Sequence, residues 1–231
     1  MDVIILCGGL GKRLRKVIND RPKPMAAINK RPFLDILIAY LRNFGFRYFI
    51  LSIGYKAENI KEYYNKKKTL NIRFSEEKTP LGTGGAFKMA QAFIRSNSFL
   101  VMNGDSFCNV NLNKFLKFHI QKNALASIVL VKDRQNKDCG RVKVLSSNQI
   151  AFFKEKTEST NDSLVNVGIY MFKKDIFSLM PKDKKFSLEY DFFPKITKER
   201  FLGYLTNSIL LDIGTPEGLK RANLYFKHFK R

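Results

Sequence analysis

Apolar and polar positions in the first half of the chain follow two alternating periods. Four short apolar runs have the length of buried strands, at residues 3–7, 48–53, 72–75 and 99–103. The segments with helical periodicity between them are residues 33–44, 58–64 and 84–93. Strands that alternate with helices form parallel sheets with crossover helices. The pattern therefore predicts an α/β fold with a Rossmann-like, mostly parallel sheet whose loops meet at the carboxyl ends of the strands.

The second half has a different balance of strands and helices. A predicted helix at 113–122 is followed mainly by strands, at residues 127–132, 141–145, 150–154, 165–172, 201–205 and 209–212. Helical stretches are predicted near 175–180 and 188–196, and Thr215 is expected to cap a last helix with Pro216 at its first position. Because no linker or repeat interrupts the chain, we expect one domain, 1–231. It divides into a phosphate-binding half, 1–110, and a mixed-sheet half, 111–231, with room for a second ligand.

The composition is strongly basic. The 231 residues include 42 Lys and Arg against 20 Asp and Glu, a net charge of +22. Such a charge favours anionic partners, and both a nucleic-acid surface and an evenly solvated surface are compatible with it. The lysines are spread along the whole chain, whereas nucleic-acid footprints gather on one face. We therefore expect no nucleic-acid partner.

Several features bear on the cellular compartment. The apolar runs are far shorter than the roughly 18 residues of a membrane helix, so no membrane association is expected. No basic leader precedes the first run, so no signal peptide is expected. Three widely spaced cysteines, Cys7, Cys108 and Cys139, form no C-x-x-C pair. A reduced, cytoplasmic setting is the simplest interpretation.

The first strand leads directly into a glycine-rich loop, residues 8–13, with the sequence GGLGKR. Its bare backbone N–H groups suit phosphate binding at a sheet edge. The dinucleotide motif G-x-G-x-x-G fails because Leu14 stands at its last position, and the Walker A motif fails because Arg13 replaces the hydroxyl residue. The loop and its basic residues Lys12 and Arg13 suit a triphosphate, although a solvated glycine turn would look similar.

A second basic element follows at residues 21–25, with the sequence RPKPM. The prolines on both sides of Lys23 are expected to deny it helical geometry and to hold it rigidly. A rigid lysine suits a point-charge contact with phosphate, but an ordinary proline-braced loop is an equal alternative.

Taken together, these motifs resemble the signature of the sugar-1-phosphate nucleotidyltransferases. Further motifs of that family occur in the family's order, at residues 80–85 (PLGTGG), 103–105 (NGD), 155–156 (EK), 166–170 (NVGIY), 187–189 (SLE) and 212–216 (DIGTP). The resemblance spans nearly the whole chain. It implies the reaction of an NTP with a sugar 1-phosphate to give an NDP-sugar and pyrophosphate.

The resemblance also implies roles for individual residues. Arg13, Lys23, Asp105 and Asp212 would be catalytic, and the two aspartates would bind Mg²⁺, which takes one or two protein carboxylates. The nucleotide would contact Leu6, Gly8, Gly9, Gly11, Lys12, Arg13, Glu77, Gly82 and Gly85. The sugar phosphate would contact Lys23, Gly104, Glu155, Lys156, Asn166 and Glu189. Each aspartate alone could be a turn former, Glu155 and Lys156 an exposed charge pair, and Glu189 a helix cap.

Base choice follows from hydrogen-bond chemistry. Guanine presents adjacent N1–H and N2–H₂ donors that one carboxylate can accept, and uracil and thymine lack this pair. Glu77 stands where thymidylyl enzymes of the family typically carry glutamine, so we expect it to read guanine. Gly82 and Gly85 would let the backbone approach the base or ribose.

Within the family, the segments at 15–26 and 80–86 look most like the branch that transfers a guanylyl group from GTP to D-glycero-α-D-manno-heptose 1-phosphate for surface polysaccharide synthesis. Uridylyl or cytidylyl transfer, a mannose, glucose or N-acetylated sugar 1-phosphate, and a catalytically silent nucleotide-sugar-binding regulator remain open. The chain stops after its last helix, so a stand-alone catalytic domain without a C-terminal β-helix is expected. The resemblance also admits a homodimer.

Other reactive side chains are assigned no role. His119 and His228 have no partner at metal-ligand spacing and are expected to be solvated or half-buried on helices. Cys7 has no base nearby in the sequence, so nucleophilic catalysis is not expected.

Overall fold

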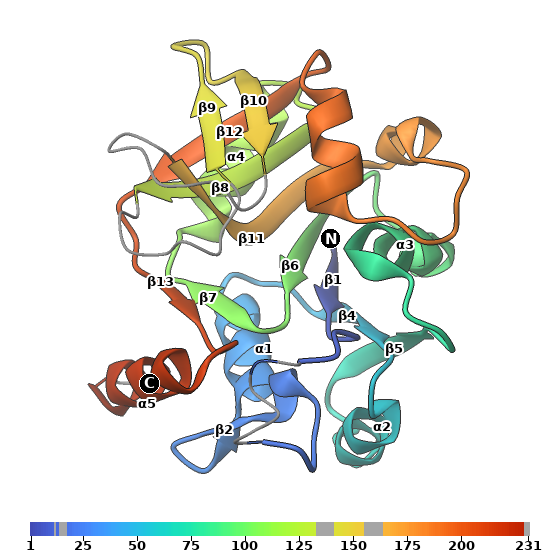
Figure 1. Cartoon of the computed structure of the whole chain (residues 1–231), viewed down its shortest axis with the longest axis vertical. Coiled ribbons are helices and arrows are strands. Elements are labelled where there is room, and N and C mark those ends of the chain that lie inside the picture. Colours follow the sequence, from blue (N-terminus) through green and yellow to red (C-terminus); the bar gives the residue numbers. More distant parts are fainter. Residues whose placement is uncertain (12, 14–17, 133–140, 155–163, 229–231) are drawn as a thin grey trace.

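Nine strands of the described part of the chain form one sheet at the centre of the molecule (Figure 1). The computed structural model describes residues 1–11, 13, 18–132, 141–154 and 164–228. Four strands of the sheet pair in parallel, in the order β6 (Ser98–Asn103), β1 (Asp2–Leu6), β4 (Tyr48–Ile53) and β5 (Asn71–Glu76). The predicted Rossmann-like arrangement of the first half is thus confirmed.

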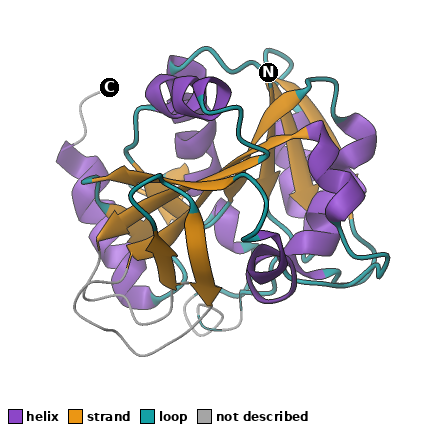
Figure 2. Cartoon of the chain, turned by 90° about the horizontal axis from the view of Figure 1, so that it is seen from above, coloured by secondary structure: helices purple, strands orange, loops and turns teal. Residues whose placement is uncertain are grey.

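Three helices connect the parallel strands: α1 (Phe33–Asn43), α2 (Ala57–Asn65) and α3 (Gly82–Met89), the last continuing as a 3₁₀ turn, Ala90–Phe93. Helices flank the twisted sheet on both sides (Figure 2). The two-residue period of β1 divides its side chains between two cores: Val3 and Ile5 pack on the side of α1, and Ile4 on the side of α3. Both faces are therefore covered, as an almost wholly apolar strand requires.

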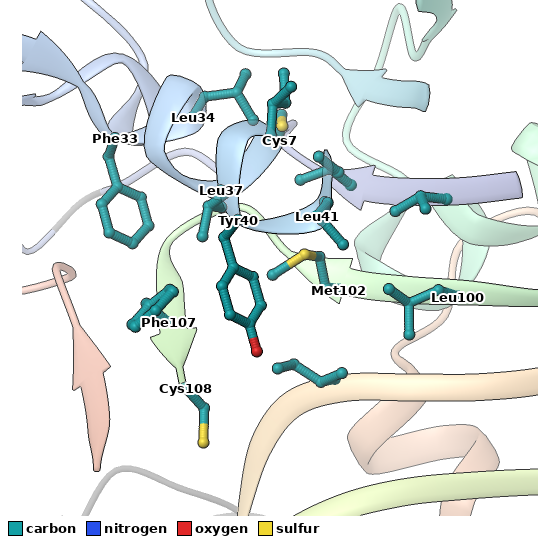
Figure 3. Packing of buried hydrophobic residues seen from close by; sticks show 14 of the residues in the cluster. Cys7, Phe33, Leu34, Leu37, Tyr40, Leu41, Leu100, Met102, Phe107 and Cys108 are labelled. Atoms are coloured by element: carbon teal, nitrogen blue, oxygen red, sulfur yellow. The ribbon is translucent and has the colours of Figure 1, made fainter. Parts of the chain in front are cut away.

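The α1 core shows how the predicted helical face is used. Leu37, Tyr40 and Leu41 of α1 lie over Met102 of β6 (Figure 3). The ring of Tyr40 meets that of Phe107 edge to face, with 5.0 Å between centroids, and its hydroxyl donates to the carbonyl of a neighbouring loop residue. This packing holds α1 against the face of the sheet at β6.

The second half extends the same sheet with mixed pairing. β11 (Leu164–Lys173) runs antiparallel to β6 and to β8 (Ala126–Lys132), and β12 (Phe201–Thr206) runs parallel to β8. A hairpin of β9 (Arg141–Val144) and β10 (Ile150–Lys154) completes it beside β11. The predicted mixed sheet is confirmed. The two helical stretches are short turns: a 3₁₀ helix, Lys174–Leu179, and a π turn, Leu188–Phe192, followed by a 3₁₀ turn, Phe193–Ile196.

Two short pairings were not predicted. β2 (Ala27–Ile28) pairs with β3 (Arg31–Pro32), and β7 (Ser106–Cys108) pairs with β13 (Leu210–Asp212) outside the main sheet. Strands of two or three residues are too short to show a hydrophobic period. The predicted cap of α5 (Pro216–His228) is present, because the backbone N–H of Gly218 donates to Thr215 Oγ1 at 3.1 Å.

The expectation for His119 is wrong. The side chain is fully buried on α4 (Leu112–Gln121), on the same face as Leu112 and Phe115. Its Nδ1 lies 2.9 Å from Ser127 Oγ on β8. The spacing of three and four residues puts all three side chains on the core side of the helix. The side chain of His228 lies outside the described residues.

In the part of the chain that the structure describes, no helix combines the length and the apolar character needed to cross a membrane.

Candidate active site

A cavity of about 350 Å³ opens at the carboxyl ends of β1, β4 and β6. Its wall is built from residues far apart in the sequence: Leu6, Cys7, Gly8, Gly9, Leu10, Lys23, Pro24, Ser52, Glu77, Pro80, Gly82, Thr83, Ala86, Asn103 and Asp105. Seven of the residues predicted for the site are among them. The strand ends of a parallel sheet converge at one edge, so the sheet itself brings these residues together.

Lys23 lines this cavity from a 3₁₀ turn, Lys23–Met25. The expectation that the prolines exclude helical geometry is wrong, because Pro22 precedes the turn in an extended conformation and Pro24 occupies its first part, where no backbone N–H is needed. Lys23 Nζ lies 3.2 Å from Asp105 Oδ2. The glycine loop packs on the stem of the same lysine, since a Cβ at Gly11 would lie 2.9 Å from Lys23 Cγ. The turn thus presents a fixed ammonium group beside a carboxylate.

Asp105 and Asp212 approach each other through the short β7–β13 sheet. Asp212 pairs in register with Ser106, the neighbour of Asp105, and the N–H of Ile213 donates to the Asp105 carbonyl at 3.0 Å. Burial and the charge of Asp105 raise the pKa of Asp212, whereas the Gly214 N–H, 2.6 Å from Asp212 Oδ1, acts in the opposite direction. The two carboxylates therefore repel each other at short range.

Of the residues that the structure describes, Lys23 and Arg13 are the cations that act on this carboxylate pair. Arg13 Nη2 lies 4.0 Å from Asp212 Oδ2, and the positive charges of both residues lower the pKa of Asp212. Among the described residues, no third His, Cys, Asp or Glu joins the pair as a metal-binding group. Two carboxylates with room for phosphate oxygens and water fit Mg²⁺, which seldom takes more protein ligands than that.

Glu77 also lines the cavity. Its Oε2 accepts a hydrogen bond from the Leu81 N–H at 3.0 Å, and burial raises the pKa of its carboxyl group. Glycines make room for this side chain, because a Cβ at Gly8 or Gly54 would lie 2.6 or 2.7 Å from Glu77 Oε1. The carboxylate is therefore held at one place by the glycine loop and by the segment that precedes α3.

The sequence profile of the nucleotidyl transferase family matches residues 2–228. The chain belongs to this family. It is 38% identical over 231 residues to the D-glycero-α-D-manno-heptose 1-phosphate guanylyltransferase of Aneurinibacillus thermoaerophilus, a match that covers 99% of this chain and 100% of the relative. It is 40% identical over 219 residues to the enzyme of the same name from Campylobacter jejuni subsp. jejuni serotype O:2, with 94% and 96% covered.

A solved structure is similar over the same extent. HddC from Yersinia pseudotuberculosis complexed with GMP-PN superimposes with a TM-score of 0.84 at 35% identity, covering 97% of this chain and 99% of that chain. The architecture described above is therefore that of a nucleotidyltransferase.

Three of the glycines predicted to approach the nucleotide or sugar phosphate have packing reasons in this nucleotidyltransferase. Gly82 lines the cavity, but a Cβ there would lie 2.5 Å from a carbonyl oxygen of the second half, and its φ of +74° favours glycine. Gly85 is not part of the cavity wall, and a Cβ there would lie 2.1 Å from the Lys184 carbonyl oxygen. Gly104 donates to the Leu6 carbonyl at 2.9 Å and joins two strand ends.

The structure describes only some of the residues that were predicted to contact the sugar. Asn166 and Glu189 are not in the cavity wall. Asn166 is hydrogen-bonded within the second half, and Glu189 is hydrogen-bonded both there and to Thr83 of the first half. Glu155 and Lys156 lie outside the described residues, as does Lys12, which was predicted to bind the nucleotide.

Three hydroxyl or amide residues of the cavity wall were not predicted as site residues from the sequence: Ser52, Thr83 and Asn103. Ser52 Oγ and Asn103 Oδ1 are buried and have no hydrogen-bond partner among the described residues, so both can accept a ligand contact. Each of these two polar residues stands at or near the carboxyl end of an apolar strand. This position at the end of a strand is the sequence signal that could have indicated both residues as site residues.

Cys7 also lines the cavity. Burial, together with the charge of Asp105, raises the pKa of its thiol, so the group stays protonated at neutral pH. This state is unsuited to nucleophilic attack, in agreement with the sequence-based expectation.

Proposed function

We propose that this nucleotidyltransferase transfers the guanylyl group of GTP to D-glycero-α-D-manno-heptose 1-phosphate and releases pyrophosphate. The observation that carries the proposal is the ammonium of Lys23, 3.2 Å from Asp105 and beside Asp212, in the wall of a cavity formed by the strand ends. The names of the two relatives and the GMP-PN bound by HddC support the guanylyl group, and the same names support the heptose.

In the proposed reaction, an oxygen of the sugar phosphate attacks the α-phosphorus of GTP. A new P–O bond forms as the bond between the α-phosphorus and the bridging oxygen breaks, and pyrophosphate takes the electron pair. Such a step depends on aligning two anions and neutralising their charge. Arg13 would bind the triphosphate, and Lys23 would hold the α-phosphate close to the sugar phosphate. Mg²⁺ held by Asp105 and Asp212 would supply further positive charge at these phosphates.

The two halves would divide the substrates between them. Residues 1–110 provide all of the wall residues named above and would bind the nucleotide, with the glycine loop at the phosphates and Glu77 at the N1–H and N2–H₂ donors of guanine. Residues 111–231 would bind the sugar, with Asn166, Glu155 and Lys156 as proposed contacts. The product would serve surface polysaccharide synthesis in the cytoplasm, where thiols such as Cys7 and Cys108 stay reduced.

The direct test is to supply the purified protein with each NTP and a panel of sugar 1-phosphates and to measure pyrophosphate. We expect release with GTP and the heptose phosphate in the presence of Mg²⁺, and none after chelation. Release that prefers another sugar 1-phosphate would contradict the heptose assignment. Nucleotide binding without release from any pair would identify a catalytically silent relative.

The carboxylate pair is tested by Asp105→Asn. We expect kcat/KM to fall at least about 100-fold, because an amide neither carries the charge nor binds Mg²⁺ as strongly. Asp175→Asn, an exposed aspartate at the start of a 3₁₀ helix, is the matched control and should keep full activity. Unchanged turnover in Asp105→Asn would contradict the metal role.

Base choice is tested by Glu77→Gln. The amide can still accept from the Leu81 N–H, but its NH₂ group faces the guanine donors. We expect kcat/KM for GTP to fall about 10- to 100-fold. The ratio of kcat/KM for GTP to kcat/KM for UTP should fall with it. A lower kcat/KM with an unchanged ratio would mean that Glu77 does not read the base.

A further inference from the structure

The segment at residues 80–85, which contributes Pro80, Gly82 and Thr83 to the cavity wall, rests on a segment of the second half. The N–H of Phe186 donates to the Leu81 carbonyl at 3.0 Å, and the N–H groups of Gly84 and Gly85 donate to the Phe186 carbonyl at 3.0 and 3.2 Å. Contact is so close that a Cβ at Gly84 would lie 2.2 Å from the Phe186 ring. Because the two segments are tightly packed, a shift of one must therefore displace the other.

One side chain of that wall, Thr83, is held by the second half through its hydroxyl group. Thr83 Oγ1 accepts from the Leu188 N–H at 2.9 Å and donates to Glu189 Oε2 at 2.6 Å. The same carboxylate oxygen accepts from Ser187 Oγ at 2.8 Å. Bonds to a carboxylate are stronger than bonds between neutral groups, so Glu189 fixes the rotamer of a residue that lines the cavity.

The other oxygen of the same carboxylate faces β11. The Tyr170 hydroxyl donates to Glu189 Oε1 at the long distance of 3.4 Å, and it accepts from Asn166 Nδ2 at 2.8 Å. Asn166 Oδ1 in turn accepts from the Gly168 N–H at 2.8 Å. Both Asn166 and Tyr170 are buried, so this branch of the network is screened from water.

We propose that Glu189 is a positioning residue that couples the nucleotide and sugar subsites. It holds Thr83, which lines the cavity, with one oxygen and meets the Tyr170–Asn166 pair with the other. This role differs from the direct sugar contact expected from the sequence, because both carboxylate oxygens face protein hydroxyl groups. The inference rests on the proposed function, which places GTP in the cavity and the sugar near Asn166.

Coupling of this kind has a thermodynamic signature. If ordering of Thr83 by the nucleotide tightens the Glu189–Tyr170–Asn166 branch, each substrate raises the affinity of the other by the same factor. We expect this factor to be about 5-fold or more in the wild-type enzyme. It is measured as the ratio of dissociation constants for α,β-methylene-GTP, which cannot release pyrophosphate, without and with saturating sugar 1-phosphate.

Four variants separate coupling from simple loss of affinity. Glu189→Gln and Thr83→Val should each bring the ratio close to 1, and Thr83→Ser, which keeps the hydroxyl, should retain it. Because the readout is a ratio, a uniform change in nucleotide affinity cancels. Asp191→Asn is the matched control: Asp191 Oδ2 accepts the Ser187 N–H at 2.7 Å in the same turn, and no hydrogen bond joins it to Thr83. This variant should leave the ratio unchanged.

The double variant Thr83→Val with Glu189→Gln should lose no more coupling than either single variant, because both remove one connection. Should Glu189→Gln fail to fold, Thr83→Val carries the test alone. Weaker sugar binding in Glu189→Gln at every nucleotide concentration, with normal coupling in Thr83→Val, would overturn the proposal in favour of direct sugar contact. Unchanged ratios in both variants would also overturn it. A wild-type enzyme that releases no pyrophosphate from any substrate pair would instead overturn the proposed function.

Discussion

His119 makes the stability of this enzyme depend on pH in a range where most carboxylates are still ionised. Burial, reinforced by the charge of Lys173, lowers the pKa of His119 from 6.5 to about 4. The imidazole is fully buried, with one nitrogen 2.9 Å from Ser127 Oγ, and Nε2 has no partner among the described residues. Protonation would place a charge in the core, so the folded protein resists it.

The sign and size of the change in the free energy of unfolding with pH follow from proton linkage. Below pH 6.5 the unfolded chain binds a proton that the folded chain does not, so the free energy of unfolding falls as the pH falls. The loss in the free energy of unfolding that His119 causes is roughly 3 kcal/mol, and it is reached near pH 4. Between pH 7 and pH 5 the loss is about 2 kcal/mol, a large part of the stability of an ordinary domain.

Urea unfolding at pH 7, 6 and 5 measures this loss in the wild-type enzyme and in His119→Phe. The phenyl ring has nearly the same shape and cannot titrate, so we expect the variant to lose about 2 kcal/mol less over that range. It starts from a lower stability at pH 7, because Ser127 loses its partner. Ser127→Ala is the matched control, which keeps the imidazole and should keep the pH dependence. Equal losses in wild type and His119→Phe would refute the reasoning.

Two further predictions concern close packing and a buried carboxylate. Gly85→Ala should lower the free energy of unfolding by about 1–3 kcal/mol, because its Cβ would lie 2.1 Å from the Lys184 carbonyl oxygen. Gly9→Ala, whose Cβ would meet nothing within 4 Å, is the control, and equal urea midpoints for the two would contradict the packing argument. Asp2→Ala should cost about 2 kcal/mol in the same assay, because Asp2 Oδ2 accepts the N–H groups of residues 95–96 at 2.6 and 2.7 Å. An unchanged midpoint would show that water replaces the carboxylate there.

The strands and crossover helices were predictable from the sequence because their burial follows local periods. The predicted run at 48–53 coincides with β4, and 150–154 coincides with β10. Burial of α1 on the predicted face follows from the same logic, since one stripe of a helix must face the sheet. Hydrophobic periods do not predict pairings between strands of two or three residues. The pairing of β7 with β13 was therefore not predicted from the sequence.

The candidate site also has one part that was predictable from the sequence and another part that was not. The residue types that suit phosphate and Mg²⁺ were recognisable along the chain, including Lys23, Asp105 and Asp212. Their assembly depends on the β7–β13 register, which carries Asp212 to Asp105 across more than a hundred residues of sequence. A lone polar residue near a strand end, such as Ser52, gained meaning only when the cavity formed around it.

By itself, the sequence determined the order of strands and helices, the glycine loop and the identity of the charged side chains, because these depend on neighbours along the chain. Only the tertiary structure decided that Lys23 is in a 3₁₀ turn, that His119 is buried and that Glu189 bonds to Thr83. The physical reason is that hydrogen bonds and burial between distant segments depend on how helices pack on the sheet. No local pattern of residues encodes that packing.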